Sequence, residues 1–350
     1  MSNQPTFNQL QGSLAPRIAV AGKSYLYFGG TAYLGIPKNE AFLHHYIKGL
    51  ENYGLNNGTS RNNNIQLGIY YEAEKHLAKK FGAEAALVSS SGYLAAQLTV
   101  KNLSSWGRVC YAPACHPALW LAEEPQTAET SFGAWAQTLV ETINRSEQER
   151  WVLISNSMNN LFPEIYDFSF VAQIDPQKQV LLIVDDSHGL GLNNKGLGAF
   201  SALPVANHVE TVVVASMAKA LGVDAGLVLG SEKVIARLKQ SNEFLGASPP
   251  AAAGLFALMQ ADALYAAELD KLQVLAKRMA TALAGKKGWH FIPDFPVFFC
   301  KNADLSQRLL AKNILISSFP YPDKDGEIIN RIVLSSWHSE TDLKELITAL

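Results

Sequence analysis

Short apolar runs alternate with longer amphipathic stretches along most of the chain, and Gly, Asn, Asp and Ser residues separate them. The runs are rich in Val, Ile and Leu, which is typical of strands buried on both faces of a parallel sheet. The amphipathic stretches have the period of a helix, as in residues 37–53, where Phe42 and Tyr46 lie one turn apart. This alternation predicts an α/β protein with a mostly parallel, doubly wound sheet. Its expected strands are residues 85–89, 108–111, 152–154, 180–184, 212–214 and 226–230.

The pattern also separates the ends of the chain from its middle. Residues 1–24 are polar and irregular, and we expect an arm without regular structure that leads to a short strand at 25–28. After Pro249-Pro250, one long Ala-rich helix is expected to run to about Leu283 and to link a small C-terminal domain. We therefore predict an N-terminal segment (1–35), a large domain (36–250) and a linking helix with a small α+β domain (251–350). The remaining expected helices are 69–81, 92–103, 232–242 and 340–350, and the C-terminal strands are 298–300, 315–318 and 331–334.

Lys219 lies between two of the apolar runs, where a charged side chain is unusual. The run 212–214 precedes it after a turn of small residues, and the run 226–230 follows it. Burying an unpaired amine is costly, and desolvation lowers its pKa. Such an amine is a good nucleophile and is suited to forming a Schiff base. The alternative is a lysine at a strand end whose ammonium group stays in water.

Two carboxylates directly follow another apolar run. Asp185 and Asp186 come after Val184, and His188 follows two residues later. Ligands in α/β proteins bind at the carboxyl ends of parallel strands, and an Asp there can keep a pyridine nitrogen protonated. Successive strand residues point to opposite faces, so we expect only Asp185 to face such a ring. The alternative is that these residues only cap the next turn.

Composition excludes several classes of protein. The chain has 350 residues, 48% of them hydrophobic, which is enough for one large domain and a smaller one. The net charge of −2, without a basic block, gives no indication of binding to nucleic acid or to a membrane surface. No signal peptide or membrane-spanning run is recognisable. The cysteines Cys110, Cys115 and Cys300 lack metal-binding spacing and fit free thiols, so we expect a cytoplasmic protein without a metal site.

A series of short motifs, from about Tyr25 to the C-terminus, resembles the α-oxoamine synthase family of fold-type I pyridoxal-phosphate enzymes. No single motif is decisive, but their order and spacing together are specific. The resemblance implies a large domain with a mostly parallel doubly wound sheet, a smaller C-terminal α+β domain, and pyridoxal 5′-phosphate (PLP) as cofactor. The motifs are Tyr33-Leu-Gly35, Gly58-Thr-Ser-Arg61, Ser91-Gly-Tyr93, Val184-Asp-Asp-Ser-His-Gly189, Ser216-Met-Ala-Lys219 and Arg331-Ile-Val-Leu334.

The resemblance implies catalytic and substrate-binding roles. Lys219 would hold the cofactor as a Schiff base and then act as acid and base. Asp185 would pair with the pyridine nitrogen. His188 would bind the phenolic oxygen, and Ser216 that oxygen or the phosphate. Arg331 would hold the carboxylate of the amino-acid substrate with its planar fork.

Further cofactor contacts are implied in the same way. Ser91, Gly92 and Tyr93 lie at a strand-to-helix junction, where free N–H groups form an anion site, and would hold the phosphate. His116 would stack on the ring and take part in catalysis, and Ser157 opens a further motif that contacts the cofactor. Judged from the residues alone, such junctions are common, and a loop histidine with its tip in water is the favoured interpretation of His116.

The implied reaction is acyl transfer to an amino acid. A small amino acid, L-alanine as the first expectation, would condense with a pimeloyl-type thioester of coenzyme A or acyl carrier protein and lose carbon dioxide, a step of biotin synthesis. The resemblance also implies a homodimer. Two other interpretations stay open: an aminotransferase or lyase on the same fold, and a non-catalytic binding protein that kept the fold.

The sequence departs from the family at positions that orient the substrate, whereas the cofactor residues are present. These differences therefore concern which substrate is bound. The apolar residues Ile65, Ile69 and Tyr70 suggest room for an acyl chain, with ordinary core packing as the alternative. The differing residues are Thr31, Ala32, Ile65, Tyr70 and Asn159-Asn160.

Overall fold

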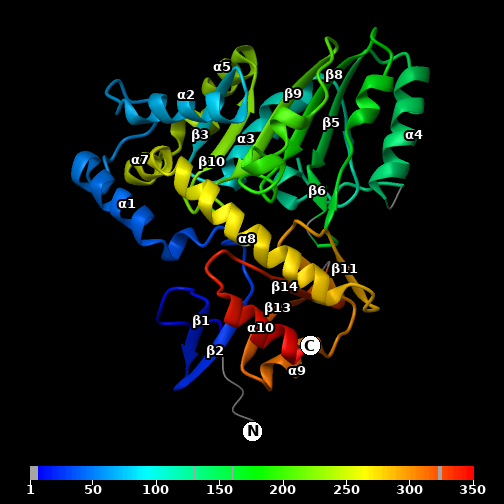
Figure 1. The fold of residues 1–350 in the computed structure, drawn as a ribbon. Coiled ribbons are helices and arrows are strands. Elements are labelled where there is room, and N and C mark those ends of the chain that lie inside the picture. The colour runs from blue at the N-terminus through cyan, green and yellow to red at the C-terminus, as the bar shows by residue number, and fades with distance from the viewer. Residues whose placement is uncertain (1–6, 129–130, 160, 322–324) are drawn as a thin grey trace. The chain divides into compact units, whose positions relative to one another are not determined.

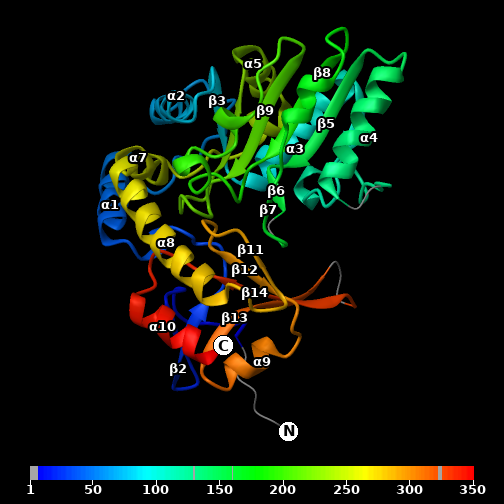
Figure 2. The same cartoon turned by 45° about the vertical axis from the view of Figure 1, so that its right-hand side comes forward.

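The computed structural model of the chain describes residues 7–128, 131–159, 161–321 and 325–350. The chain divides into two compact units (Figures 1 and 2). Unit 1 comprises residues 1–40, 160–164 and 264–350, and unit 2 comprises residues 41–159 and 165–263. The candidate cofactor residues belong to unit 2, and Arg331 belongs to unit 1.

Unit 2 is built on a six-stranded sheet whose central strands are parallel. Strands β4, β5, β8 and β9 run parallel, and β10 runs antiparallel to both β9 and β3. The inner strands are buried almost completely because their Val, Ile and Leu side chains face helices or loops on both sides. The α/β sheet predicted from the alternation is therefore confirmed. In spatial order the strands are β3 (Ala85–Ser89), β10 (Gly226–Gly230), β9 (Val209–Ser216), β8 (Gln179–Asp185), β5 (Arg150–Asn156) and β4 (Arg108–Tyr111).

The helices of unit 2 begin mostly at serine caps. The hydroxyls of Ser91, Ser131, Ser231 and Ser241 accept first-turn N–H groups that would otherwise lack partners. Helix α3 packs on β9 and β10, while α2 and α5 pack on β3 (Figure 1). The helices are α1 (Glu40–Tyr53), α2 (Ile69–Phe81), α3 (Gly92–Leu103), α4 (Phe132–Arg145), α5 (Glu232–Lys239), α6 (Asn242–Gly246) and α7 (Ala252–Gln260); β6 (Met158–Asn159) and β7 (Glu164–Ile165) form a small separate sheet.

Unit 1 contains a second six-stranded sheet, with the order β1-β2-β13-β14-β12-β11. Helix α10 begins at a capping box, in which Ser339 and Asp342 each bond the other's main chain. The strands are β1 (Arg17–Val20), β2 (Lys23–Phe28), β11 (Trp289–Phe291), β12 (Val297–Cys300), β13 (Ile314–Tyr321) and β14 (Glu327–Val333). The helices are α8 (Asp262–Leu283), α9 (Leu305–Leu310) and α10 (Glu340–Ala349).

The N-terminal segment differs from the prediction of an irregular arm. Residues 17–20 form β1, which pairs antiparallel with β2 in a hairpin. The two turn residues, Ala21 and Gly22, both have positive φ, as a two-residue hairpin turn of the primed type requires. The polar composition of the segment concealed this strand, because β1 buries only Ile18.

Two predicted helices are wrong in their continuity. The long helix expected after Pro249-Pro250 is divided into α7 and α8 at Ala261, which leaves helical geometry at the end of α7. The helix expected over 232–242 ends at Lys239, and the separately capped α6 follows it.

Among the described residues, no helix is long and apolar enough to cross a membrane.

Candidate active site

Lys219 lies on the connection between β9 and β10, as predicted. Its neighbours Met217 and Ala220 are buried, whereas Lys219 itself is partly exposed. Main-chain bonds close the connection, because Met217 N–H donates to the Ala225 carbonyl and Val223 N–H donates to that of Met217. The amine is thus carried by a compact, internally bonded turn at the end of a buried strand.

Asp185 and Asp186 occupy different environments. Asp185 ends β8, is partly exposed, and accepts the Ser187 N–H at 2.8 Å through Oδ1. Asp186 is 1% exposed and accepts the Ala199 N–H at 2.7 Å through Oδ2. Burial raises the pKa of Asp186 to about 7, against smaller opposing effects of the Ser157 hydroxyl and the Ala199 N–H. The two carboxylates therefore have separate tasks: Asp186 holds the following loop, and Asp185 is the one left at the strand end.

The ends of β8 and β9 are joined by a short hydrogen bond. The hydroxyl of Ser187 accepts the Ser216 N–H at 2.9 Å, and Asp185 is in register with Val214. Ser216 is therefore held beside the residues that follow β8, and His188, partly exposed, lies within that same segment. This arrangement brings Asp185, His188, Ser216 and Lys219 to one edge of the sheet.

His116 is fixed to that edge by a residue that sequence reasoning missed. Asn156, the last residue of β5, accepts the His116 N–H at 3.1 Å and donates to the Ala114 carbonyl at 2.7 Å. The His116 Nδ1 accepts the Ala118 N–H, so in the neutral ring the proton is on Nε2. Burial lowers the pKa of His116. The charge of Asp185 raises this pKa, and the charge of Lys219 lowers it. The charges of Asp185 and Lys219, both proposed cofactor residues, thus act on the pKa of His116. The sequence feature that could have indicated Asn156 is its position at the end of a predicted strand.

The start of α3 packs directly on the end of β9. A Cβ on Gly92 would overlap the Ser216 Cβ and lie 2.6 Å from its Cα, and a Cβ on Gly226 would overlap the Ser91 carbonyl oxygen. The Ser91 hydroxyl caps Leu94 N–H at 3.1 Å, and helix geometry leaves the N–H groups of Gly92 and Tyr93 without intrahelical acceptors. The Tyr93 side chain is exposed. The glycines therefore bring a helix N-terminus against the strand end that precedes Lys219.

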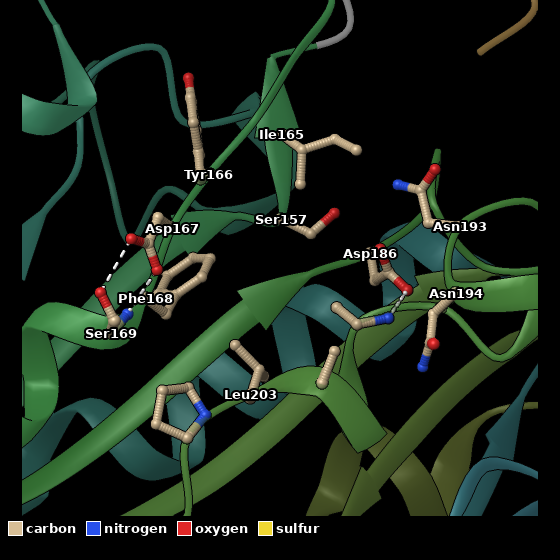
Figure 3. Close-up of a pocket in the computed structure, with 14 residues that line it drawn as sticks. Ser157, Ile165, Tyr166, Asp167, Phe168, Ser169, Asp186, Asn193, Asn194 and Leu203 are labelled. Atoms are coloured by element: carbon tan, nitrogen blue, oxygen red, sulfur yellow. Dashed lines mark hydrogen bonds between the residues drawn. The ribbon is translucent and has the colours of Figure 1, made fainter. Parts of the chain in front are cut away.

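Ser157 lies elsewhere than the other candidate cofactor residues. Its N–H donates to the Asp185 carbonyl, but its hydroxyl lines a cavity of about 310 Å³ that none of those residues lines (Figure 3). Figure 3 shows the hydroxyl pointing toward Asp186 and Asn193. A cofactor contact by Ser157 stays a prediction.

Arg331 is buried in the sheet of unit 1. It lies on β14, is 6% exposed, and its guanidinium carbon is 5.6 Å from the centre of the Phe319 ring. Burial lowers its pKa, and the nearby Tyr33 phenol raises it. The predicted buried strand is confirmed, and a planar cation on such a strand is rigidly held.

Of the positions that depart from the family, Tyr70 is packed in the core of unit 2. Ile69 and Tyr70 are buried in unit 2, whereas Ile65 is 74% exposed. The Arg61 guanidinium carbon lies 4.8 Å from the centre of the Tyr70 ring. Tyr70 also lines a cavity of about 490 Å³ together with polar and apolar residues of 55–60 and 248–252. The burial of Ile69 and Tyr70 agrees with the alternative of core packing, and an acyl-chain site at Ile65, Ile69 and Tyr70 stays a prediction. Asn160 lies outside the described residues.

The residues at this edge fit the groups of PLP. The backbone N–H groups at the start of α3 suit a phosphate, the Asp185 carboxylate suits a protonated ring nitrogen, and the Lys219 amine suits an aldehyde. Two glycines without room for a Cβ bring these elements into direct contact. Unit 2 thus contains residues that suit each of these three groups of the cofactor.

Comparison with known proteins agrees with the geometry. Residues 38–350 match the family described as aminotransferase class I and II. The chain belongs to this family. It is 26% identical to an 8-amino-7-oxononanoate synthase of Nitrosospira multiformis, over 97% of this chain and 90% of that protein, and 27% identical to one of Thiobacillus denitrificans, over 97% and 91%.

The fold of this aminotransferase-family chain is also found in solved structures. Serine palmitoyltransferase of Sphingomonas wittichii matches with a TM-score of 0.81 at 17% identity, over 99% of this chain and 90% of that one. An 8-amino-7-oxononanoate synthase of Francisella tularensis matches with a TM-score of 0.66 at 18% identity, over 93% and 96%. A further serine palmitoyltransferase structure contains the PLP internal aldimine. The fold-type I architecture predicted from the motifs is confirmed.

Proposed function

We propose that the protein is a PLP-dependent acyltransferase that condenses a small amino acid with an acyl thioester and releases carbon dioxide, as in 8-amino-7-oxononanoate synthesis. L-Alanine and a pimeloyl-type thioester, carried by coenzyme A or acyl carrier protein, are the proposed substrates. The observation that carries this proposal is the convergence of Lys219, Asp185, His116 and the Gly92 junction on one edge of the unit 2 sheet. The full-length similarity to the synthases supports the choice of reaction.

When bound, PLP supplies the electron sink that labilises the substrate's α-position. Lys219 would hold the cofactor through its amine and would serve as base and acid for the α-proton of the substrate. Asp185 keeps the ring nitrogen protonated. Burial lowers the pKa of His116, which favours the neutral ring, and this flat ring would stack on the cofactor, while Ser216 and His188 would bind its oxygen substituents.

Arg331 is the proposed anchor of the substrate carboxylate. Its planar guanidinium, held on a buried strand, has the geometry to bind both oxygens of a carboxylate. We also propose that the protein acts as a homodimer in the cytoplasm.

Cofactor attachment is tested with Lys219→Ala. The wild-type protein with PLP should show a visible absorbance band that borohydride abolishes, and mass spectrometry should find the reduced adduct on Lys219. Lys233→Ala, which removes an exposed lysine of α5, serves as the control and should keep the adduct. A reduced adduct on another lysine in both variants would contradict the assignment.

The reaction is tested with L-alanine, glycine and L-serine against a panel of acyl-CoA and acyl-carrier thioesters. Free thiol and carbon dioxide should appear together in equal amounts. If neither appears and the amino acid is converted to its oxo acid, the protein is an aminotransferase. Absence of any spectral response to amino acids would favour a binding protein.

A further inference from the structure

The cavity beside Asp186 lies within unit 2 and contains none of the residues assigned to cofactor attachment or ring binding. Its volume of about 310 Å³ is many times the roughly 15 Å³ that one water molecule requires by the same measure. We call its exposed lining residues Ile165, Asp167 and Ala202 the mouth of the cavity, and its buried lining residues Ser157 and Asp186 the floor. The lining residues are Ser157, Ile165, Tyr166, Asp167, Phe168, Ser169, Asp186, Asn193, Asn194, Gly198, Ala199, Ala202, Leu203 and Pro204.

The floor of the cavity carries two buried polar atoms without a hydrogen-bond partner in the described part of the chain. These are Oδ1 of Asp186, whose side chain is 1% exposed, and Oγ of Ser157, which is 5% exposed. Ser157 lies near enough to lower the pKa of Asp186, but the two groups are not in hydrogen-bonding geometry. A buried carboxylate oxygen and hydroxyl left in this state favour a ligand that donates hydrogen bonds.

The surrounding chain is shaped to keep this carboxylate in place. A Cβ on Gly189 would overlap Oδ1 of Asp186, and a Cβ on Gly198 would overlap Oδ2. The second oxygen is already held by the Ala199 N–H at 2.7 Å, so Oδ1 has a fixed position. The loop between the two glycines therefore closes around a carboxylate that lines the cavity and whose Oδ1 has no hydrogen-bond partner in the described part of the chain.

The charge of the lining selects the sign of the ligand. Two carboxylates, Asp167 and Asp186, line the cavity, and none of its lining residues, all of which are described, is Lys, Arg or His. Asp167 is exposed at the mouth and bonds the Ser169 N–H and hydroxyl at 2.8 Å each. An anionic ligand such as a carboxylate or phosphate would meet only negative charge here, whereas a cation would be attracted.

The apolar wall distinguishes an organic cation from a bare ion. Tyr166 and Phe168 line the cavity and belong to an aromatic cluster around Phe132. The Phe132 ring stacks on the Tyr166 ring with 4.1 Å between their centres, and its centre lies 5.2 Å from that of Phe168. Leu203 and Pro204 add further apolar surface. No cluster of three or more His, Cys, Asp or Glu able to hold a metal occurs among the described residues. The rigid apolar wall and the volume both suit a body of several carbon atoms.

We propose that this cavity is a second ligand site, separate from the proposed acyl-transfer chemistry, that binds a small organic ammonium compound. An ammonium N–H group would donate to Oδ1 of Asp186 or to Oγ of Ser157, and the carbon chain would pack against Phe168 and Leu203.

The site has a definite pH dependence. Asp186 is half protonated near pH 7, under the influence of burial, Asp185 and Lys219, and only its ionised form attracts the cation. An alkylammonium group stays charged throughout this range, since amine pKa values lie near 10. Affinity should therefore rise about tenfold between pH 6 and pH 8, as the ionised fraction rises from about a tenth to about nine tenths.

The test uses the PLP-loaded protein and N,N-dimethylbutylammonium chloride. A tertiary amine cannot form a Schiff base with the cofactor aldehyde, so its binding reports on this cavity. Binding is measured by titration calorimetry and by the shift in thermal midpoint at constant ionic strength, with sodium butyrate and potassium chloride as the anionic and bare-ion probes. Stabilisation by the amine, and by neither of the other probes, is the expected result.

Three variants localise the effect. Ala202→Phe fills the mouth from an exposed position and should weaken binding at least tenfold, as should Asp186→Asn. Val205→Phe places the same ring on the same loop at a residue that is 99% exposed and does not line the cavity, and it should bind like the wild type. If Asp186→Asn does not fold, Ala202→Phe decides alone. Equal binding by Ala202→Phe and the wild type, equal stabilisation by potassium, or no response to the amine at any pH would each overturn the proposal.

Discussion

At the scale of single residues, the adjacent carboxylates Asp185 and Asp186 have opposite environments, and this difference assigns their roles. Asp185→Asn should keep covalent PLP attachment but lose about a hundredfold or more in turnover, because an amide does not keep the ring nitrogen protonated, and electrostatic contacts of this kind contribute on the order of 3 kcal/mol. Absorbance titration with PLP and single-turnover rates measure the two effects separately.

Asp186→Asn is the matched variant for this prediction. It changes a carboxylate that binds the Ala199 N–H, so it should alter stability and pH dependence more than turnover. If Asp186→Asn is the crippled enzyme and Asp185→Asn turns over normally, the roles of the two residues are reversed.

The buried Asp186 also predicts how stability changes with pH. Its folded-state pKa, about 7, lies above the unfolded value, so the folded state binds more protons between these values and this group's stabilisation decreases as pH rises through that window. The free energy of unfolding should fall by about 2 kcal/mol between pH 5 and 7 from this group alone. Urea unfolding at each pH measures it, and Asp186→Asn should show a flatter profile; parallel profiles would contradict the burial argument.

At the scale of elements, the contact between α3 and β9 depends on Gly92. Gly92→Ala would press a methyl group against the Ser216 backbone, and we expect it to destabilise the protein by about 1–3 kcal/mol and to weaken PLP binding. Gly133→Ala in α4, where a Cβ meets nothing within 4 Å, should instead stabilise by about 0.5–1 kcal/mol. Thermal melts with and without PLP compare the two. Equal effects of both changes would show that the junction is not tightly packed.

The elements that sequence reasoning predicted correctly are those with a strong hydrophobic period. Strands β3, β4 and β10 and helix α2 have the predicted bounds because turn residues or Gly82 delimit them. Strand β1 was missed because it buries only one of its four side chains, and its pairing partner supplies most of its stability. No Gly or Pro lies at the break between α7 and α8, and the Ala-rich pattern continues through it. The sequence therefore predicted one continuous helix.

In the candidate site, too, only residues with a distinct sequence pattern could be predicted. Residues whose chemistry is rare between buried strands, such as Lys219 and Asp185, were predictable from the sequence. Asn156 acts through main-chain contacts with residues about forty positions away, and the cavity at Asp186 depends on where two loops meet. Neither leaves a periodic or motif-like pattern in the sequence.

At the scale of the whole molecule, the proposed homodimer has a testable surface in unit 2. Leu43 and Ile47 lie four residues apart on one face of α1 and are 57% and 46% exposed, and the following loop exposes Leu55 at 84%. Apolar side chains gathered on one helix face are typical of interaction sites, whereas single exposed ones are not. A second copy of the chain that covers this face would remove the three side chains from water.

Replacing both α1 residues, as Leu43→Asp with Ile47→Asp, should therefore convert a dimer into a monomer, because a buried unpaired carboxylate costs several kcal/mol. Light scattering and sedimentation at micromolar concentration measure the mass of each form. Val205→Asp makes the same kind of change at an isolated apolar residue that is 99% exposed, and it should leave the mass unchanged. Circular dichroism must show that the double variant is folded, since α1 also packs Gly49 closely against Ala253. A wild-type protein that is fully active as a monomer, or a double variant that stays dimeric, would contradict the assignment of this face.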